Sequence, residues 1–98
     1  MISIQEKIYQ DLAFKLINEI NSTNLFNGTI EIDYSELYTT LHCTLLVYYT
    51  RDCIEERNFL AIKDIVPVWW ELETASAYGF EHNDFSWGEF YKYLKAYF

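Results

Sequence analysis

The chain is 98 residues long, close to the commonest size of a single domain, and 51% of its residues are hydrophobic. Fifteen acidic residues oppose seven basic ones, which gives a formal net charge of −8. This charge repels nucleic acid phosphates and anionic membrane surfaces. We therefore expect one domain over residues 1–98 that binds neither nucleic acid directly nor a membrane.

Two further features concern the compartment. The longest apolar runs, residues 45–49 and 65–70, are far shorter than the ~20 residues of a membrane-spanning helix, and no secretory signal opens the chain. A cytoplasmic location is expected. Cys43 and Cys53 are then expected to be free thiols. They lie ten residues apart and could face each other across a hairpin, so a disulfide between them stays open.

The first predicted element is a helix. Ser3 and Glu6 have the spacing of a capping box. Apolar residues then recur every three to four positions, which predicts one buried stripe along a helix. The polar run at residues 21–24 ends it. The stripe consists of Ile8, Tyr9, Leu12, Ala13, Leu16, Ile17 and Ile20.

Two strands are predicted next. Residues 29–34 alternate between apolar and polar side chains, and residues 37–50 do so over a longer stretch. In the longer stretch one face is aliphatic and suits the core, whereas the other mixes tyrosine, threonine and histidine and suits a half-exposed sheet surface. Residues 51–58 are charged and are expected to form a loop.

A third strand is predicted over residues 59–73. Pro67 interrupts it, so the strand must lie at a sheet edge, carry a bulge or be split there. Trp69 and Trp70 are neighbours and should point to opposite faces. A bulge at Pro67 would exchange them, so the pattern leaves open which of the two is exposed. Residues 74–83 are expected to be a loop that bends at Gly79.

The last predicted element is a second helix. Ser86 and Glu89 repeat the capping-box spacing, and Phe85 and Phe90 can form a hydrophobic staple. The order α-β-β-β-α favours an α+β fold, with a three-stranded antiparallel sheet and both helices packed on one face.

No catalytic, cofactor-binding or metal-binding motif is present. His42 and Cys43 are adjacent in a strand and face opposite sides, so no paired metal ligands arise there. Cys53 with His82 could form a nucleophilic pair only if the fold brings two loops together. A cluster of late acids could supply acid–base chemistry, but a solvated acidic face explains it more simply. These acids are Glu71, Glu73, Glu81, Asp84 and Glu89.

Aromatic residues are more numerous than one small core easily holds, at 19% of the chain. Tryptophan and tyrosine are enriched at protein interfaces. A compact aromatic core with partial exposure would also account for them. The candidate interface consists of the sheet face away from the helices and the segment from Tyr78 to Asp84. Its candidate residues are Tyr38, His42, Tyr48, Trp69, Trp70, Tyr78, Phe80 and Trp87.

Residues 68–73 read VWWELE, residues 83–86 read NDFS, and an aromatic final helix follows. In these strings the last third of the chain resembles small uncharacterised acidic proteins of Bacteroides-type prophage and conjugative elements. The resemblance implies a bacterial mobile-element context and no particular activity.

We expect a non-enzymatic protein-interaction module without a cofactor, which binds a protein partner or itself. The alternative is an acidic DNA mimic that antagonises a nucleic-acid-binding protein, which needs carboxylates spaced along one face. A third possibility is a small enzyme with an unrecognised site.

Overall fold

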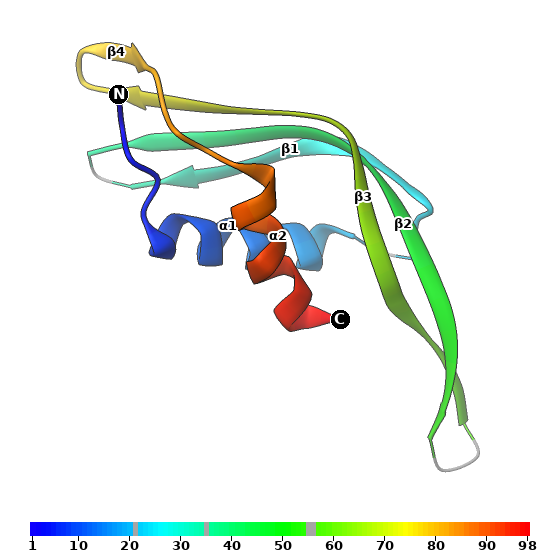
Figure 1. The fold of residues 1–98 in the computed structure, drawn as a ribbon. Helices are drawn as coiled ribbons and strands as arrows, with labels where there is room; N and C mark the ends of the chain where they lie inside the picture. The colour runs from blue at the N-terminus through cyan, green and yellow to red at the C-terminus, as the bar shows by residue number, and fades with distance from the viewer. Residues whose placement is uncertain (21, 35, 55–56) are drawn as a thin grey trace.

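The computed structural model describes residues 1–20, 22–34, 36–54 and 57–98, and it describes side chains outside 52–59. The helices and strands follow one another along the chain, as Figure 1 shows. In chain order they are α1 (Glu6–Glu19), β1 (Leu25–Asp33), β2 (Tyr38–Ile54), β3 (Arg57–Ser76), β4 (Gly79–Glu81), α2 (Trp87–Leu94) and the 3-10 turn η1 (Lys95–Tyr97).

The fold is α+β, as predicted, with one strand more than expected. The sheet is antiparallel with strand order β1-β2-β3-β4. The extra strand β4 lies within residues 74–83, which were predicted to be a loop. Gly79 makes the predicted bend at a φ of 110°, which favours glycine. Thr74 then donates its hydroxyl proton to the carbonyl of Glu81 at 2.7 Å, which joins the short strand to β3.

The predicted loop at residues 51–58 is also wrong, because β2 continues to Ile54 and β3 begins at Arg57. Only residues 55 and 56 of that loop fall outside the described part. Register shifts interrupt the β2–β3 pairing between Thr44 and Leu45 and between Tyr48 and Tyr49. Bulges bend a strand pair and increase its twist. The far end of this hairpin accordingly curls toward the helix side of the sheet (Figure 1).

The strand geometry settles how the two cysteines relate. Cys43 and Cys53 both lie in β2. Ten residues of extended strand separate their Cα atoms by about 33 Å. A disulfide needs Cα atoms within about 7 Å, so the two cannot pair across a hairpin.

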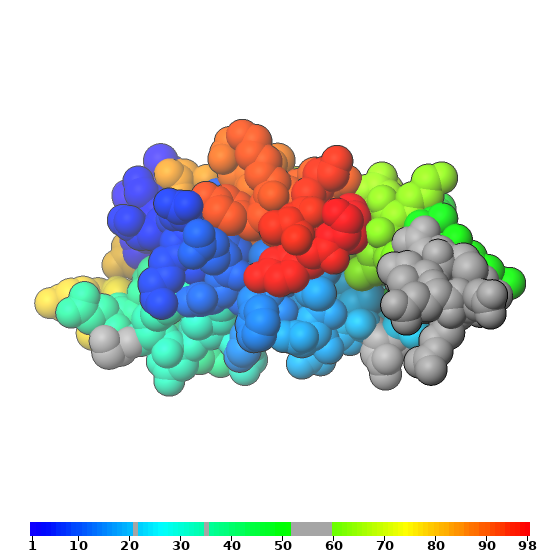
Figure 2. All heavy atoms as spheres, turned by 90° about the horizontal axis from the view of Figure 1, so that it is seen from below, coloured from blue at the N-terminus to red at the C-terminus, as the bar shows by residue number. Residues whose placement is uncertain are grey.

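Both helices cover the same face of the sheet, as Figure 2 shows in the view from the helix side. β2 supplies the aliphatic face predicted for the core. The aromatic side chain of Phe90 in α2 is fully buried against it. The core consists of Ile4, Ile8, Tyr9, Leu12, Ala13, Leu16, Ile20, Ile30, Leu41, Cys43, Leu45, Val47, Ile65, Leu72, Phe90 and Leu94.

The two predicted capping boxes differ in outcome. At α1 the expectation is wrong, because the helix begins one residue after Gln5, and Gln5 makes no side-chain cap. At α2 half of the box forms, because the hydroxyl of Ser86 accepts a hydrogen bond from the Glu89 N–H at 3.4 Å. The other half does not form, because the Ser86 N–H donates to the Tyr9 hydroxyl and the Glu89 carboxylate accepts from Lys92. The rings of Phe85 and Phe90 lie 5.6 Å apart between centroids, which confirms the staple contact.

The N-terminal residues are attached to the segment before α2. Ile2 pairs with Asn83 in a parallel bridge, and the Ile4 N–H donates to the Asp84 carboxylate at 2.6 Å. These contacts hold residues 2–4 beside residues 83 and 84. In the described part of the chain, no helix has the length and apolar character needed to cross a bilayer.

Candidate functional site

The sheet has a helix-free face, defined by the side chains that point away from α1 and α2. Paired residues in an antiparallel sheet share a face, so the register assigns these positions. They fall into cross-strand rows, which are Leu25–Leu46–Val66, Asn27–Thr44–Trp69, Thr29–His42–Glu71, Glu31–Thr40–Glu73 and Asp33–Tyr38–Ala75–Phe80.

One end of this face is apolar. Leu25, Leu46 and Val66 are neighbours across three strands, and all three are exposed. Trp69 follows on β3 with 51% of its surface exposed. We call these four side chains the apolar end. Tyr48 continues it along β2 and is half exposed. Apolar side chains that adjoin one another on a surface are a feature of interaction sites, whereas scattered ones are not.

The middle of the face is acidic. Glu31 and Asp33 lie on β1, and Glu71 and Glu73 lie on β3, on either side of the central strand. We call these four residues the acidic band. His42 lies between the two pairs. Its Nε2 is 3.4 Å from a Glu73 carboxylate oxygen and its Nδ1 is 3.2 Å from the Thr29 hydroxyl. No lysine or arginine occupies an outward position in the rows above.

The other end is aromatic. Tyr38 and Phe80 share the last row, and Tyr78 occupies the β3–β4 turn. Tyr78 and Phe80 are 96% and 82% exposed. A hydrogen bond to Glu31 raises the pKa of Tyr38, with smaller contributions from desolvation and nearby carboxylates. Of the predicted interface residues, Tyr38, His42, Tyr48, Trp69 and Phe80 thus lie on one face, with Tyr78 at its margin.

Trp70 and Trp87 lie elsewhere. Trp70 pairs with the buried Cys43 and therefore faces the helix side. Its ring centroid is 5.6 Å from that of Trp87 in α2. The sequence left open which of the two neighbours is exposed, and the structure exposes both: Trp69, on the helix-free face, is 51% exposed and Trp70, on the helix side, is 41% exposed. The predicted interface residues therefore lie on two sides of the sheet. Trp70 and Trp87, on the helix side, pack α2 against β3.

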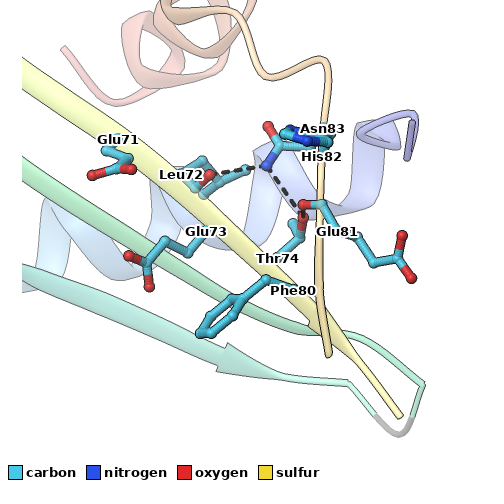
Figure 3. A pocket seen from close by; sticks show the side chains of 8 residues that line it. All are labelled: Glu71, Leu72, Glu73, Thr74, Phe80, Glu81, His82 and Asn83. Atoms are coloured by element: carbon cyan, nitrogen blue, oxygen red, sulfur yellow. Dashed lines mark hydrogen bonds between the residues drawn. The ribbon is translucent and has the colours of Figure 1, made fainter. Parts of the chain in front are cut away.

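A hollow of about 400 Å³ lies at the β3 edge beside residues 80–83. Figure 3 shows Glu73 and Glu81 pointing away from each other across it. The Asn83 side-chain amide donates to the Leu72 carbonyl at 2.9 Å and to the Thr74 hydroxyl at 3.2 Å. The asparagine thus has a structural role at this edge. Acid–base catalysis would need carboxylates that converge on a bound substrate. Glu73 and Glu81 do not converge in this way.

The structure also locates the residues that the sequence offered as metal ligands or as a reactive thiol. Among the described residues, no three histidine, cysteine or acidic side chains form a group that could hold a metal ion. His42 is outward and Cys43 is buried, so the two face opposite sides, as expected. Burial raises the pKa of the Cys43 thiol to about 11, which disfavours the reactive thiolate. The possible pair of Cys53 with His82 involves a side chain outside the described residues.

Sequence reasoning missed the apolar end as a site. Alternation over residues 37–50 places Leu46 on the outward face, but its two neighbours in the row depend on register. Leu25 lies before the predicted first strand, and Val66 follows from the shift in pairing next to Pro67. One signal in the sequence points to the apolar end: Leu46 is an aliphatic residue on the otherwise polar and aromatic outward side of residues 37–50.

Comparison of the chain with protein-family models, with curated proteins and with solved structures found no match.

Proposed function

We propose that the chain is a non-enzymatic protein-interaction module whose binding surface is the helix-free face of its sheet. The observation that carries the proposal is the apolar end, where exposed side chains from three neighbouring strands adjoin one another. Burial of apolar surface drives association at about 25 cal/mol per Å², less the costs of association. Trp69 is the expected anchor because tryptophans are enriched among residues that dominate binding energy.

Charge selects the kind of partner. The acidic band carries four carboxylates. The outward rows named above contain one histidine, His42, and no lysine or arginine. A protein surface with lysine or arginine beside apolar residues complements this arrangement. Face-to-face contact between two copies would instead oppose their acidic bands. The proposal therefore commits to a basic protein partner rather than to self-association through this face.

An acidic decoy for a nucleic-acid-binding protein is the second candidate. Glu31 and Asp33 are two residues apart on one strand, which separates them by about 7 Å along the strand. Glu71 and Glu73 have the same spacing two strands away, about 9.6 Å across the sheet. A DNA mimic needs carboxylates spaced along one face. The order of these four carboxylates on the helix-free face favours this candidate.

One experiment tests the first candidate and separates it from the second. The chain is immobilised and used to select from a displayed random peptide library. We expect selected peptides to combine lysine or arginine with apolar residues, and to lose binding to a Leu46→Ala/Trp69→Ala variant. Tyr97→Ala is the matched control, because this exposed tyrosine lies on η1 on the helix side.

The outcomes are distinct. Selection of no peptide, or equal binding to the face variant and to Tyr97→Ala, contradicts the proposal. A third variant neutralises the acidic band by Glu→Gln and Asp→Asn changes. If it abolishes binding while Leu46→Ala/Trp69→Ala leaves binding intact, charge mimicry replaces the apolar-anchor account.

A further inference from the structure

β1 presents a sheet edge whose backbone is open. Tyr34 and Leu37 exchange both backbone hydrogen bonds, at 3.1 and 3.2 Å. Antiparallel pairs alternate between bonded and non-bonded residues, so the odd-numbered residues of β1 direct their N–H and C=O groups away from β2. Two edge carbonyls are covered, that of Leu25 by the Thr23 hydroxyl and that of Glu31 by Lys15 Nζ. Within the described residues, no bond reaches the backbone edge groups of Asn27 or Thr29.

The β3 edge differs because several features block it. Pro67 has no N–H, and the adjoining register shift bends the strand. The Ile65 N–H is bonded to the Asp64 carboxylate at 2.8 Å, and the Leu72 carbonyl accepts from Asn83. β4 covers the last three residues. A strand can therefore add at β1 far more readily than at β3.

The surroundings of the β1 edge specify the side chains of an added strand. On the helix-free side the edge carries Glu31 and Asp33. On the helix side a hollow of about 280 Å³ is lined by Asp11, Phe14, Lys15 and Ile32. Successive residues of a strand point to opposite sides, so an added strand meets carboxylates with one set of side chains and the hollow with the other.

We propose that β1 is a strand-addition site for an extended segment of a partner protein in which lysine or arginine alternates with β-branched apolar residues. Backbone hydrogen bonds supply affinity in this mode of recognition, and alternate side chains supply specificity. A second copy of the chain fits less well, because its own Glu31 and Asp33 would enter the same acidic seam. The edge site shares Glu31 and Asp33 with the helix-free face, but it also needs the open backbone of β1 and does not need the apolar end. This inference can therefore stand if the proposed function fails.

The test uses an eight-residue peptide that alternates lysine and valine, acetylated and amidated at its ends. Binding is measured by fluorescence polarisation at 0.15 M salt. In the proposed register, lysine amides pair with β1 and valine amides face outward. Methylation of the lysine backbone nitrogens should weaken binding by about tenfold or more, whereas methylation of the valine nitrogens should change it by less than about twofold. The two methylated peptides have the same composition and charge.

A pair of chain variants completes the test. Thr29→Pro removes an edge N–H that β2 does not use, and Thr29→Val keeps it. We expect Thr29→Pro to lose binding and Thr29→Val to retain it, with the circular dichroism spectrum of both unchanged. Equal affinity of the two methylated peptides, or no binding of the parent peptide, overturns the inference. A dimer of the unliganded chain that Thr29→Pro dissociates also overturns it, because the edge then belongs to a second copy.

Discussion

The indole rings of Trp70 and Trp87 pack together on the helix side of the sheet, with centroids 5.6 Å apart, while Trp69 lies on the opposite face. Adjacent residues in one strand thus have different roles. Trp70 fastens α2 to β3, and Trp87 also contacts the buried Phe90 edge-on at 5.2 Å. Only Trp69 is available to a partner on the helix-free face.

This arrangement predicts a specific energetic coupling. A double-mutant cycle of Trp70→Ala and Trp87→Ala should give a coupling energy of about 0.5–1.5 kcal/mol, because each removal eliminates the same ring contact. The same cycle with Trp69→Ala in place of Trp70→Ala should give a value near zero. Denaturant unfolding measures both. Equal coupling in the two cycles would mean that the assignment of faces is wrong.

A second prediction concerns the two threonines that face each other in the core. Thr39 is fully buried and its hydroxyl has no hydrogen-bond partner among the described residues. Its cross-strand neighbour Thr74 donates to Glu81 and accepts from Asn83. Thr39→Val should raise the free energy of unfolding by about 1 kcal/mol, since it removes an unpaired polar group.

Thr74→Val is the matched control for that experiment. It should lower the free energy of unfolding by about 1–3 kcal/mol, because it leaves the groups of Glu81 and Asn83 without their partner. Chemical denaturation of both variants decides the matter. A loss of stability in Thr39→Val would show that its hydroxyl has a partner in solution.

The third prediction is an alkaline loss of stability that depends on Cys43. Burial raises the pKa of this thiol from 9.0 to about 11, so the folded chain holds the proton more tightly than the unfolded chain. The resulting stabilisation is fully present below pH 9 and is lost as the pH rises through 11. The pKa of Tyr34 is also raised, mainly by burial and then by its bond to Asp11, so it contributes with the same sign.

Replacing the thiol isolates its share. Between pH 9 and pH 11, the free energy of unfolding should fall more in the parent chain than in Cys43→Ala, by about 2 kcal/mol. Urea unfolding at a series of pH values measures the difference. Parallel pH profiles for the two chains would contradict the burial of this thiol.

Much of the fold could be predicted from local pattern. Alternation over residues 37–50 correctly divided β2 into a buried and an outward face, and Ser86 and Phe85 correctly marked the start of α2. The predicted loop at residues 51–58 failed because charge was read as a loop signal, whereas a hairpin extending past β1 can carry charged residues. β4 was missed because a three-residue strand depends on its partner rather than on its own pattern.

The candidate site could be predicted only in part. Tyr38, Tyr48 and His42 follow from alternation within one strand. The position of Trp69 required the location of the bulge, and the role of Leu25 required the pairing of β1 with β2. Trp87 was misplaced because an amphipathic helix does not reveal which sheet residue it will meet. Contacts between distant segments are set by tertiary packing rather than by local periodicity.

Hydroxyl-radical footprinting of the chain, alone and with a peptide selected from the display library, tests the central claim most directly. We predict strong oxidation of Trp69 in the unbound chain and its protection in the complex, while Tyr97 on η1 reacts equally in both. Protection of Tyr97 with no change at Trp69 would place binding on the helix side and contradict the account.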